Sequence, residues 1–113
     1  MARLLLFFAT LAFGSYQKCL HKASSTLEVL RCQDQELQRV DRLLNQAYKK
    51  VFERLPLDKK VQLRNIQRLW IRYRDAKCEY FYDPKSGRGG LEEKMECLIQ
   101  ESAHRAKELQ ELP

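Results

Sequence analysis

The feature that most constrains the fold is a repeat of apolar residues at steps of three and four. One such stripe runs from Glu36 to Leu55, and a second begins at about Leu91. This spacing places the apolar side chains on one face of a helix. The stripes are Leu37, Val40, Leu44, Ala47, Val51 and Leu55, and then Leu91, Met95, Leu98, Ser102, Ala106 and Leu109. No segment alternates as a strand would, so we predict an all-α domain.

Helix-breaking residues divide the chain between these stripes. Pro56 is expected to end the first long helix at Leu55, because the residue before a proline is pushed out of the helical region. Asp58 is expected to cap a second long helix, which continues to about Phe81. The glycine-rich sequence PKSGRGG that follows has the composition of a loop.

A capping pattern lies nearer the N-terminus. Ser25 and Glu28 have the spacing of a capping box, in which a serine and a glutamate satisfy the first backbone donors of a helix. This pattern predicts a short helix that ends near Cys32. The expected architecture is therefore a small helical domain with one short N-terminal helix and three longer helices.

The N-terminus resembles a secretory signal peptide. Arg3 precedes an apolar run from Leu4 to Phe13, with small residues at Ala12 and Gly14. The run is too short for a membrane span, which needs about 20 apolar residues. We therefore expect residues 1–14 to be removed and residues 15–113 to form one periplasmic or secreted domain with no transmembrane segment. Loss of Arg3 would lower the net charge from +6 to +5.

The four cysteines all lie in the expected mature chain. An even number of cysteines in a small exported protein favours two disulfides. Zinc sites usually contain pairs of ligands two to four residues apart, whereas the gaps here are 13, 46 and 19 residues. We therefore expect disulfides and no metal, although spacing alone does not give the pairing. The cysteines are Cys19, Cys32, Cys78 and Cys97.

The second predicted helix carries two different stripes. One is apolar and contains Leu63, Ile66, Trp70 and Tyr73, and the other is basic and contains Lys60, Arg64, Arg68 and Arg72. Because the two stripes occupy separate faces, we expect Trp70 to pack between helices and the arginines to face water. The alternative is that the basic stripe recognises an acidic partner.

The sequence contains no recognisable catalytic constellation. His21 and His104 are the two histidines of the chain, and neither lies in a recognisable nucleophile-and-base pattern. The glycine-rich loop lacks the Gly-Lys-Ser/Thr ending of a phosphate-binding loop. We therefore expect a protein that is not an enzyme and that uses no cofactor.

Charge indicates which partners to consider. An isoelectric point near 9.3 would suit nucleic-acid binding. However, an exported protein seldom meets nucleic acid, and the basic stripe lacks aromatic residues on which bases could stack. An anionic component of the cell envelope is the acidic partner that we expect instead.

The second predicted helix contains Leu63-Arg64, Gln67, Trp70, Arg74-Asp75 and Cys78. This pattern resembles the core motif of the LprI-type lysozyme-inhibitor family. Upstream, the resemblance includes Cys19, Ala23, Glu28, Cys32, Glu36-Leu37, Asp41, Leu44-Asn45 and Tyr48. Downstream, it includes Cys97-Leu98, Arg105 and Glu108-Leu109, with Ser102 where the family usually has threonine. The resemblance covers essentially the whole expected mature chain.

This resemblance implies both a fold and a function. It implies an exported helical protein with disulfides Cys19–Cys32 and Cys78–Cys97, which binds a lysozyme and blocks its cleft. Within the core motif, we expect Leu63, Gln67, Trp70, Arg74 and Asp75 to hold the fold rather than to contact a partner.

Two surfaces are candidates for binding. Animal-type lysozymes are strongly basic, so an inhibitor needs a locally acidic patch, and the start of the last helix supplies Glu92, Glu93 and Glu96. The alternative function is that of an envelope protein that binds an anionic surface or a protein partner through Arg64, Arg68 and Arg72.

Overall fold

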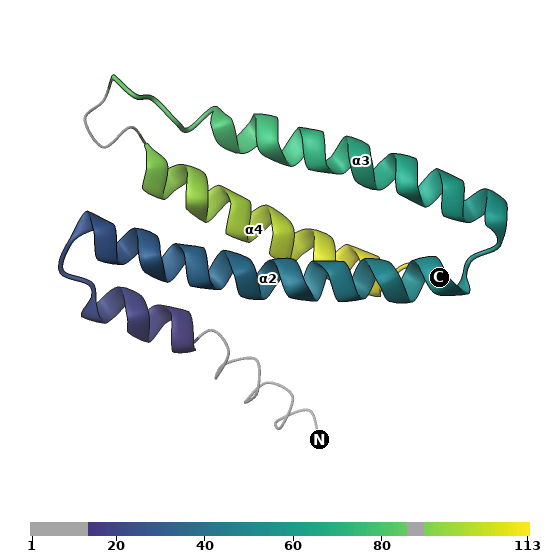
Figure 1. The fold of residues 1–113 in the computed structure, drawn as a ribbon, viewed down its shortest axis with the longest axis horizontal. Coiled ribbons are helices and arrows are strands. Elements are labelled where there is room, and N and C mark those ends of the chain that lie inside the picture. The colour runs from purple at the N-terminus through teal and green to yellow at the C-terminus, as the bar shows by residue number, and fades with distance from the viewer. Residues whose placement is uncertain (1–13, 86–89) are drawn as a thin grey trace.

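The computed structural model describes residues 14–85 and 90–113, which are helical apart from short turns and contain no strand. Residues 14–22 form a short helix. The long helices are α2 (Thr26–Arg54), α3 (Leu57–Glu79) and α4 (Leu91–Gln110). Figure 1 shows α4 lying between α2 and α3, with the short helix beside the start of α2. The all-α prediction, with one short and three longer helices, is confirmed, while the predicted signal peptide lies outside the described residues except for Gly14.

Ser25 caps a helix as predicted, but the helix is longer than predicted. The backbone N–H of Glu28 donates to Ser25 Oγ at 3.2 Å. The Glu28 carboxylate accepts from the backbone N–H of Ser24 at 2.6 Å, and this hydrogen bond lowers the pKa of Glu28. The predicted break near Cys32 is wrong, since α2 continues to Arg54. No glycine or proline stands between Cys32 and Glu36 to end the helix, and the short helix lies earlier, at residues 14–22.

The boundary between α2 and α3 is set by Pro56. Leu55 has an extended backbone with ψ 148°, so α2 ends where the sequence predicts. The N-cap of α3 is Pro56, which forms no side-chain cap. The prediction that Asp58 caps this helix is therefore wrong. Asp58 lies in the first turn, where its negative charge interacts favourably with the helix dipole.

The apolar core lies between α2 and α4, and one residue of α3 completes it. Both predicted stripes face this core, with their N-terminal members only partly buried. Tyr48, Phe52, Leu55 and Trp70 pack around its edge. The core is therefore concentrated toward the end of α2 and the end of α4. Its buried members are Leu44, Ala47, Val51, Leu63, Ala106 and Leu109.

Two disulfides join neighbouring helices. Cys19–Cys32 ties the short helix to α2, with the two Cα atoms 5.8 Å apart. Cys78–Cys97 ties the end of α3 to the start of α4, with a Cα separation of 5.4 Å. This is the pairing that the family resemblance implies. Closing loops of this size stabilises a fold by about 3 kcal/mol each in the chain-entropy account.

Gly90 fixes the direction in which the chain enters α4. Its φ of 67° lies in the left-handed region, which favours glycine. A Cβ atom at this position would also overlap the carbonyl oxygen of Phe81. The start of α4 is therefore set closely against the residues that follow α3.

Candidate functional site

The face of α3 that packs against α4 carries the residues of the core motif. Gln67 Oε1 accepts a hydrogen bond from Nε of Arg105, on α4, at 3.0 Å. The guanidinium groups of Arg74 and Arg105 lie 5.2 and 5.8 Å from the centre of the Trp70 ring. Cation–π attraction and the hydrogen bond therefore join α3 to α4 through polar as well as apolar contacts.

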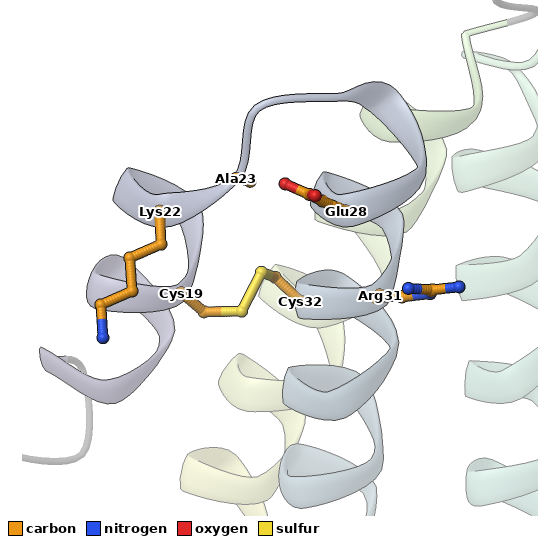
Figure 2. Close-up of a pocket in the computed structure, with 6 residues that line it drawn as sticks. All are labelled: Cys19, Lys22, Ala23, Glu28, Arg31 and Cys32. Atoms are coloured by element: carbon orange, nitrogen blue, oxygen red, sulfur yellow. A yellow bond between two sulfur atoms is a disulfide. The ribbon is translucent and has the colours of Figure 1, made fainter.

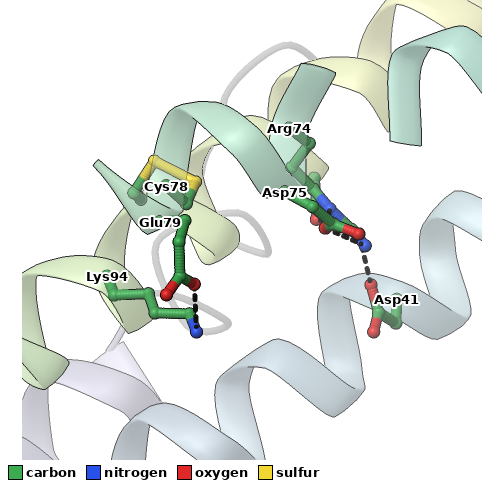
Figure 3. A network of polar contacts seen from close by, with 8 residues as sticks. Asp41, Arg74, Asp75, Cys78, Glu79 and Lys94 are labelled. Atoms are coloured by element: carbon green, nitrogen blue, oxygen red, sulfur yellow. Dashed lines mark hydrogen bonds and ion pairs between the residues drawn. A yellow bond between two sulfur atoms is a disulfide. The ribbon is translucent and has the colours of Figure 1, made fainter. Parts of the chain in front are cut away.

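Arg74 contacts all three long helices. Its Nε donates to Oδ1 of the neighbouring Asp75 at 3.0 Å, and its Nη1 donates to Ser102 Oγ on α4 at 3.3 Å. The same nitrogen lies 3.8 Å from Oδ1 of Asp41 on α2, as Figure 3 shows. Burial raises the pKa of Asp41, and the charge of Arg74 opposes that rise. The geometry fits a role in holding the helices together.

The inner face of α3 differs from the predicted one. Leu63 and Cys78 are buried and Trp70 is half-buried against the core, but Ile66 and Tyr73 are exposed. Ile66 and Tyr73, which the spacing places on the same face as Leu63 and Trp70, therefore lie outside the core. Gln67 and Arg74 occupy that face instead, because Arg105 and Ser102 of α4 provide polar partners for them.

The three predicted glutamates lie together in the first two turns of α4, and we call this surface the acidic edge. Glu96 accepts hydrogen bonds from Tyr16 Oη at 2.6 Å and from Gln100 Nε2 at 3.1 Å. The backbone oxygen of Glu92 accepts from Gln33 Nε2 at 2.9 Å. The acidic edge is thus fixed by contacts with both the short helix and α2. Its residues are Glu92, Glu93 and Glu96.

Tyr16 keeps its proton throughout the physiological pH range. Burial of its phenol raises its pKa, and the hydrogen bond to Glu96 raises the pKa further. Tyr16 therefore remains a hydrogen-bond donor to Glu96 near neutral pH. No local pattern in the sequence indicates this contact, because the two residues are 80 positions apart.

The arginine stripe lies on α3 and consists of Arg64, Arg68 and Arg72, all exposed. The guanidinium of Arg64 lies 5.5 Å from the centre of the Phe52 ring. Within residues 14–85 and 90–113, none of the ion pairs involves these three arginines. The acidic edge and the arginine stripe are on different helices, and no hydrogen bond or ion pair among the described residues links the two surfaces.

A surface hollow lies beside the first disulfide. Its volume is about 230 Å³. Figure 2 shows Lys22 and Arg31, two of its lining residues, extending away from each other on either side of the Cys19–Cys32 disulfide. In the part of the chain that the structure describes, no group of three His, Cys, Asp or Glu side chains could hold a metal ion. Among the same residues, no helix is long and apolar enough to cross a membrane.

These features define a small helical domain with two disulfides, a polar contact between α3 and α4, and charged surfaces of opposite sign. The chain matches the family model of the lysozyme inhibitor LprI over residues 19–109. Because this match spans most of the chain, the protein belongs to the LprI family. Comparisons with curated proteins and with solved structures found no match.

Proposed function

We propose that this protein binds a cell-wall lytic enzyme of the lysozyme type outside the cytoplasm and blocks its cleft without catalysing a reaction. The observation that carries this proposal is the family match over residues 19–109, which includes both disulfides and all three long helices. Disulfides are typical of proteins that function in an oxidising compartment. The signal peptide that we propose for residues 1–14 would deliver the chain there.

We further propose that the acidic edge makes the contact with the lysozyme. Glu93 is exposed and Glu92 is partly exposed. Neither carboxylate has a hydrogen bond or ion pair with any residue that the structure describes. Glu96 is already bonded to Tyr16 and Gln100, so it supports the edge while Glu92 and Glu93 meet the partner. Because the backbone of the edge is already fixed, the ordering that binding requires there is that of the Glu92 and Glu93 side chains.

The first experiment is a turbidity assay of cell-wall lysis. The protein is purified after export, so that its disulfides are formed, and is titrated against several classes of lysozyme. A reduced and alkylated sample is tested alongside. We expect near-stoichiometric inhibition of at least one class by the oxidised protein and none by the alkylated protein. Absence of inhibition of every class would contradict the proposed function.

Charge reversal locates the contact. Replacing Glu92 and Glu93 with lysine should raise the inhibition constant about tenfold or more, equivalent to about 1.4 kcal/mol of binding free energy. The matched control replaces Glu108 and Glu111, two exposed glutamates near the other end of α4, with lysine. It makes the same change in net charge, and we expect an inhibition constant within about twofold of the wild type.

A third variant tests the other surface. Replacing Arg64, Arg68 and Arg72 with glutamate should not weaken inhibition if the acidic edge is the contact. If the Glu92 and Glu93 variant and its matched control weaken inhibition equally, the net charge matters and the position of the charges does not. Loss of inhibition in the arginine variant alone would transfer the contact to α3.

A further inference from the structure

One face of α3 is apolar and uncovered. Residues 66, 69, 73, 76 and 80 follow one another at steps of three and four, so they form a line along the helix. We call this line the apolar stripe. The exposed fractions are 51% for Ile66, 64% for Leu69, 57% for Tyr73 and 86% for Tyr80. A contiguous row of large exposed apolar side chains is uncommon on a soluble monomer and marks an interaction surface.

The apolar stripe continues into a groove in the body of the protein. Ile66 belongs to both, since it also lines an apolar groove of about 320 Å³. The groove lies where the end of α2, the first half of α3 and the C-terminal residues meet. Its other apolar walls are Val51, Leu55, Leu63, Leu112 and Pro113.

Basic residues lie on both sides of the apolar stripe. At 100° per residue, Arg68 and Arg72 follow one side of it. Lys59 and Lys77 follow the other side, where Lys77 is already paired with Glu101 on α4. The helix as a whole has seven Lys or Arg and three Asp or Glu residues. Of the acidic side chains, Asp75 and Glu79 are already paired with Arg74 and Lys94. The face therefore presents positive charge around an apolar centre.

We propose that α3 binds the surface of an anionic lipid bilayer. The apolar stripe would enter the boundary between headgroups and acyl chains, while Arg68 and Arg72 bind lipid phosphates at one side. An apolar face bordered by lysine and arginine is the pattern of helices that lie in this interface. Tyr73 and Tyr80 fit the same location, since tyrosine is enriched where membrane meets water.

The charge pattern argues against two other occupants. A second copy of the chain, packed stripe against stripe, would bring two sets of basic residues together, and like charges across an interface are unfavourable. A strongly basic lysozyme would meet the same repulsion on this face. An anionic bilayer complements both the apolar centre and the positive border.

Vesicle co-sedimentation tests this proposal. The exported protein is mixed with vesicles of phosphatidylcholine alone, or of phosphatidylcholine with a minority of phosphatidylglycerol, at physiological ionic strength. We expect binding to the anionic vesicles and little to the neutral ones. Replacing Leu69 and Tyr73 with serine should weaken binding about tenfold or more, because it removes apolar area from the interface.

The matched control removes apolar side chains from another exposed surface. Leu27 and Leu43 of α2 are exposed, and serine at both positions should leave vesicle binding unchanged. Replacing Arg68 and Arg72 with glutamate should abolish binding to the anionic vesicles. Circular dichroism melting of every variant checks that the fold is intact, which is expected because all these side chains are exposed.

Three results would overturn the proposal. The wild type could fail to bind either kind of vesicle. Alternatively, the Leu69 and Tyr73 variant could bind as the wild type does, and this result would indicate adsorption by charge alone. Sedimentation velocity could instead show a dimer that the same variant dissociates, which would identify a second copy as the occupant. Lysozyme inhibition is measured on the same samples, so failure of the proposed function would be seen separately.

Discussion

Arg105 is a buried charged residue whose position depends on a few polar contacts. Its Nε bonds to Gln67 and its guanidinium packs near the Trp70 ring. Its Nη2 is buried without a hydrogen-bond partner among the described residues. Because a buried donor without a partner is costly, the Gln67 acceptor is important for the contact between α3 and α4.

Two substitutions of Gln67 separate its hydrogen bond from its shape. Gln67→Leu keeps most of the volume but removes the acceptor, and we expect it to lower the free energy of unfolding by about 1–3 kcal/mol. Gln67→Glu keeps an acceptor and adds a charge-assisted bond to Arg105, so it should retain wild-type stability or exceed it. Urea denaturation of both variants measures the difference. Equal losses in the two would show that the bond to Arg105 does not stabilise the fold.

For α3, residue spacing predicts some of the residues on the packed face correctly and others wrongly. Leu63 and Trp70 were placed on the packed face by apolar periodicity, and the structure places them there. The same rule placed Ile66 and Tyr73 there as well. It could not recognise Gln67 and Arg74 as inward-facing, because their burial depends on polar partners from α4, far away in the sequence.

At the scale of the helices, α3 is held differently from the other two long helices. An extensive apolar interface joins α2 and α4, whereas Leu63 and Cys78 are the buried residues of α3. Elements with few buried apolar contacts open locally at lower free energy than the core does. We therefore expect the Cys78–Cys97 disulfide to contribute more to the local stability of α3 than to that of the other helices.

Removing each disulfide in turn tests this difference. Cys78→Ala with Cys97→Ala should lower the stability by about 3 kcal/mol and increase hydrogen exchange along α3, while α2 and α4 stay protected. The Cys19–Cys32 disulfide is not attached to α3, so the effect of Cys19→Ala with Cys32→Ala should be confined to residues 14–22 and the start of α2. Exchange measured by mass spectrometry distinguishes the two. A uniform increase over all helices in both variants would contradict a weakly held α3.

The long helices and the short one also differ in how far the sequence predicts them. The stripes of α2 and α4 are visible because these helices pack on each other through apolar faces. The short helix at residues 14–22 has no such stripe. It is held by the Cys19–Cys32 disulfide and by the Tyr16–Glu96 hydrogen bond, and both are tertiary contacts.

The whole molecule separates charges of opposite sign. The chain has a net charge of +6, yet the acidic edge presents glutamates at the start of α4. The arginine stripe on α3 presents basic residues that form no ion pair with any described residue. A long-range electric field depends on the net charge, whereas a docked contact depends on the local charges. Salt should therefore favour the approach to a basic lysozyme but weaken the final contact with it.

Binding kinetics at different salt concentrations test this expectation. Between about 10 mM and about 150 mM salt, the Debye length falls from about 30 Å to about 8 Å. Screening should therefore raise the association rate with a strongly basic lysozyme, because it weakens the repulsion between two positive molecules. It should also raise the dissociation rate, because it weakens the contacts of Glu92 and Glu93. If the dissociation rate of the Glu92→Lys, Glu93→Lys variant depends on salt as that of the wild type does, the acidic edge is excluded as the contact surface. If the association rate of the wild type falls as salt increases, local charges dominate the approach.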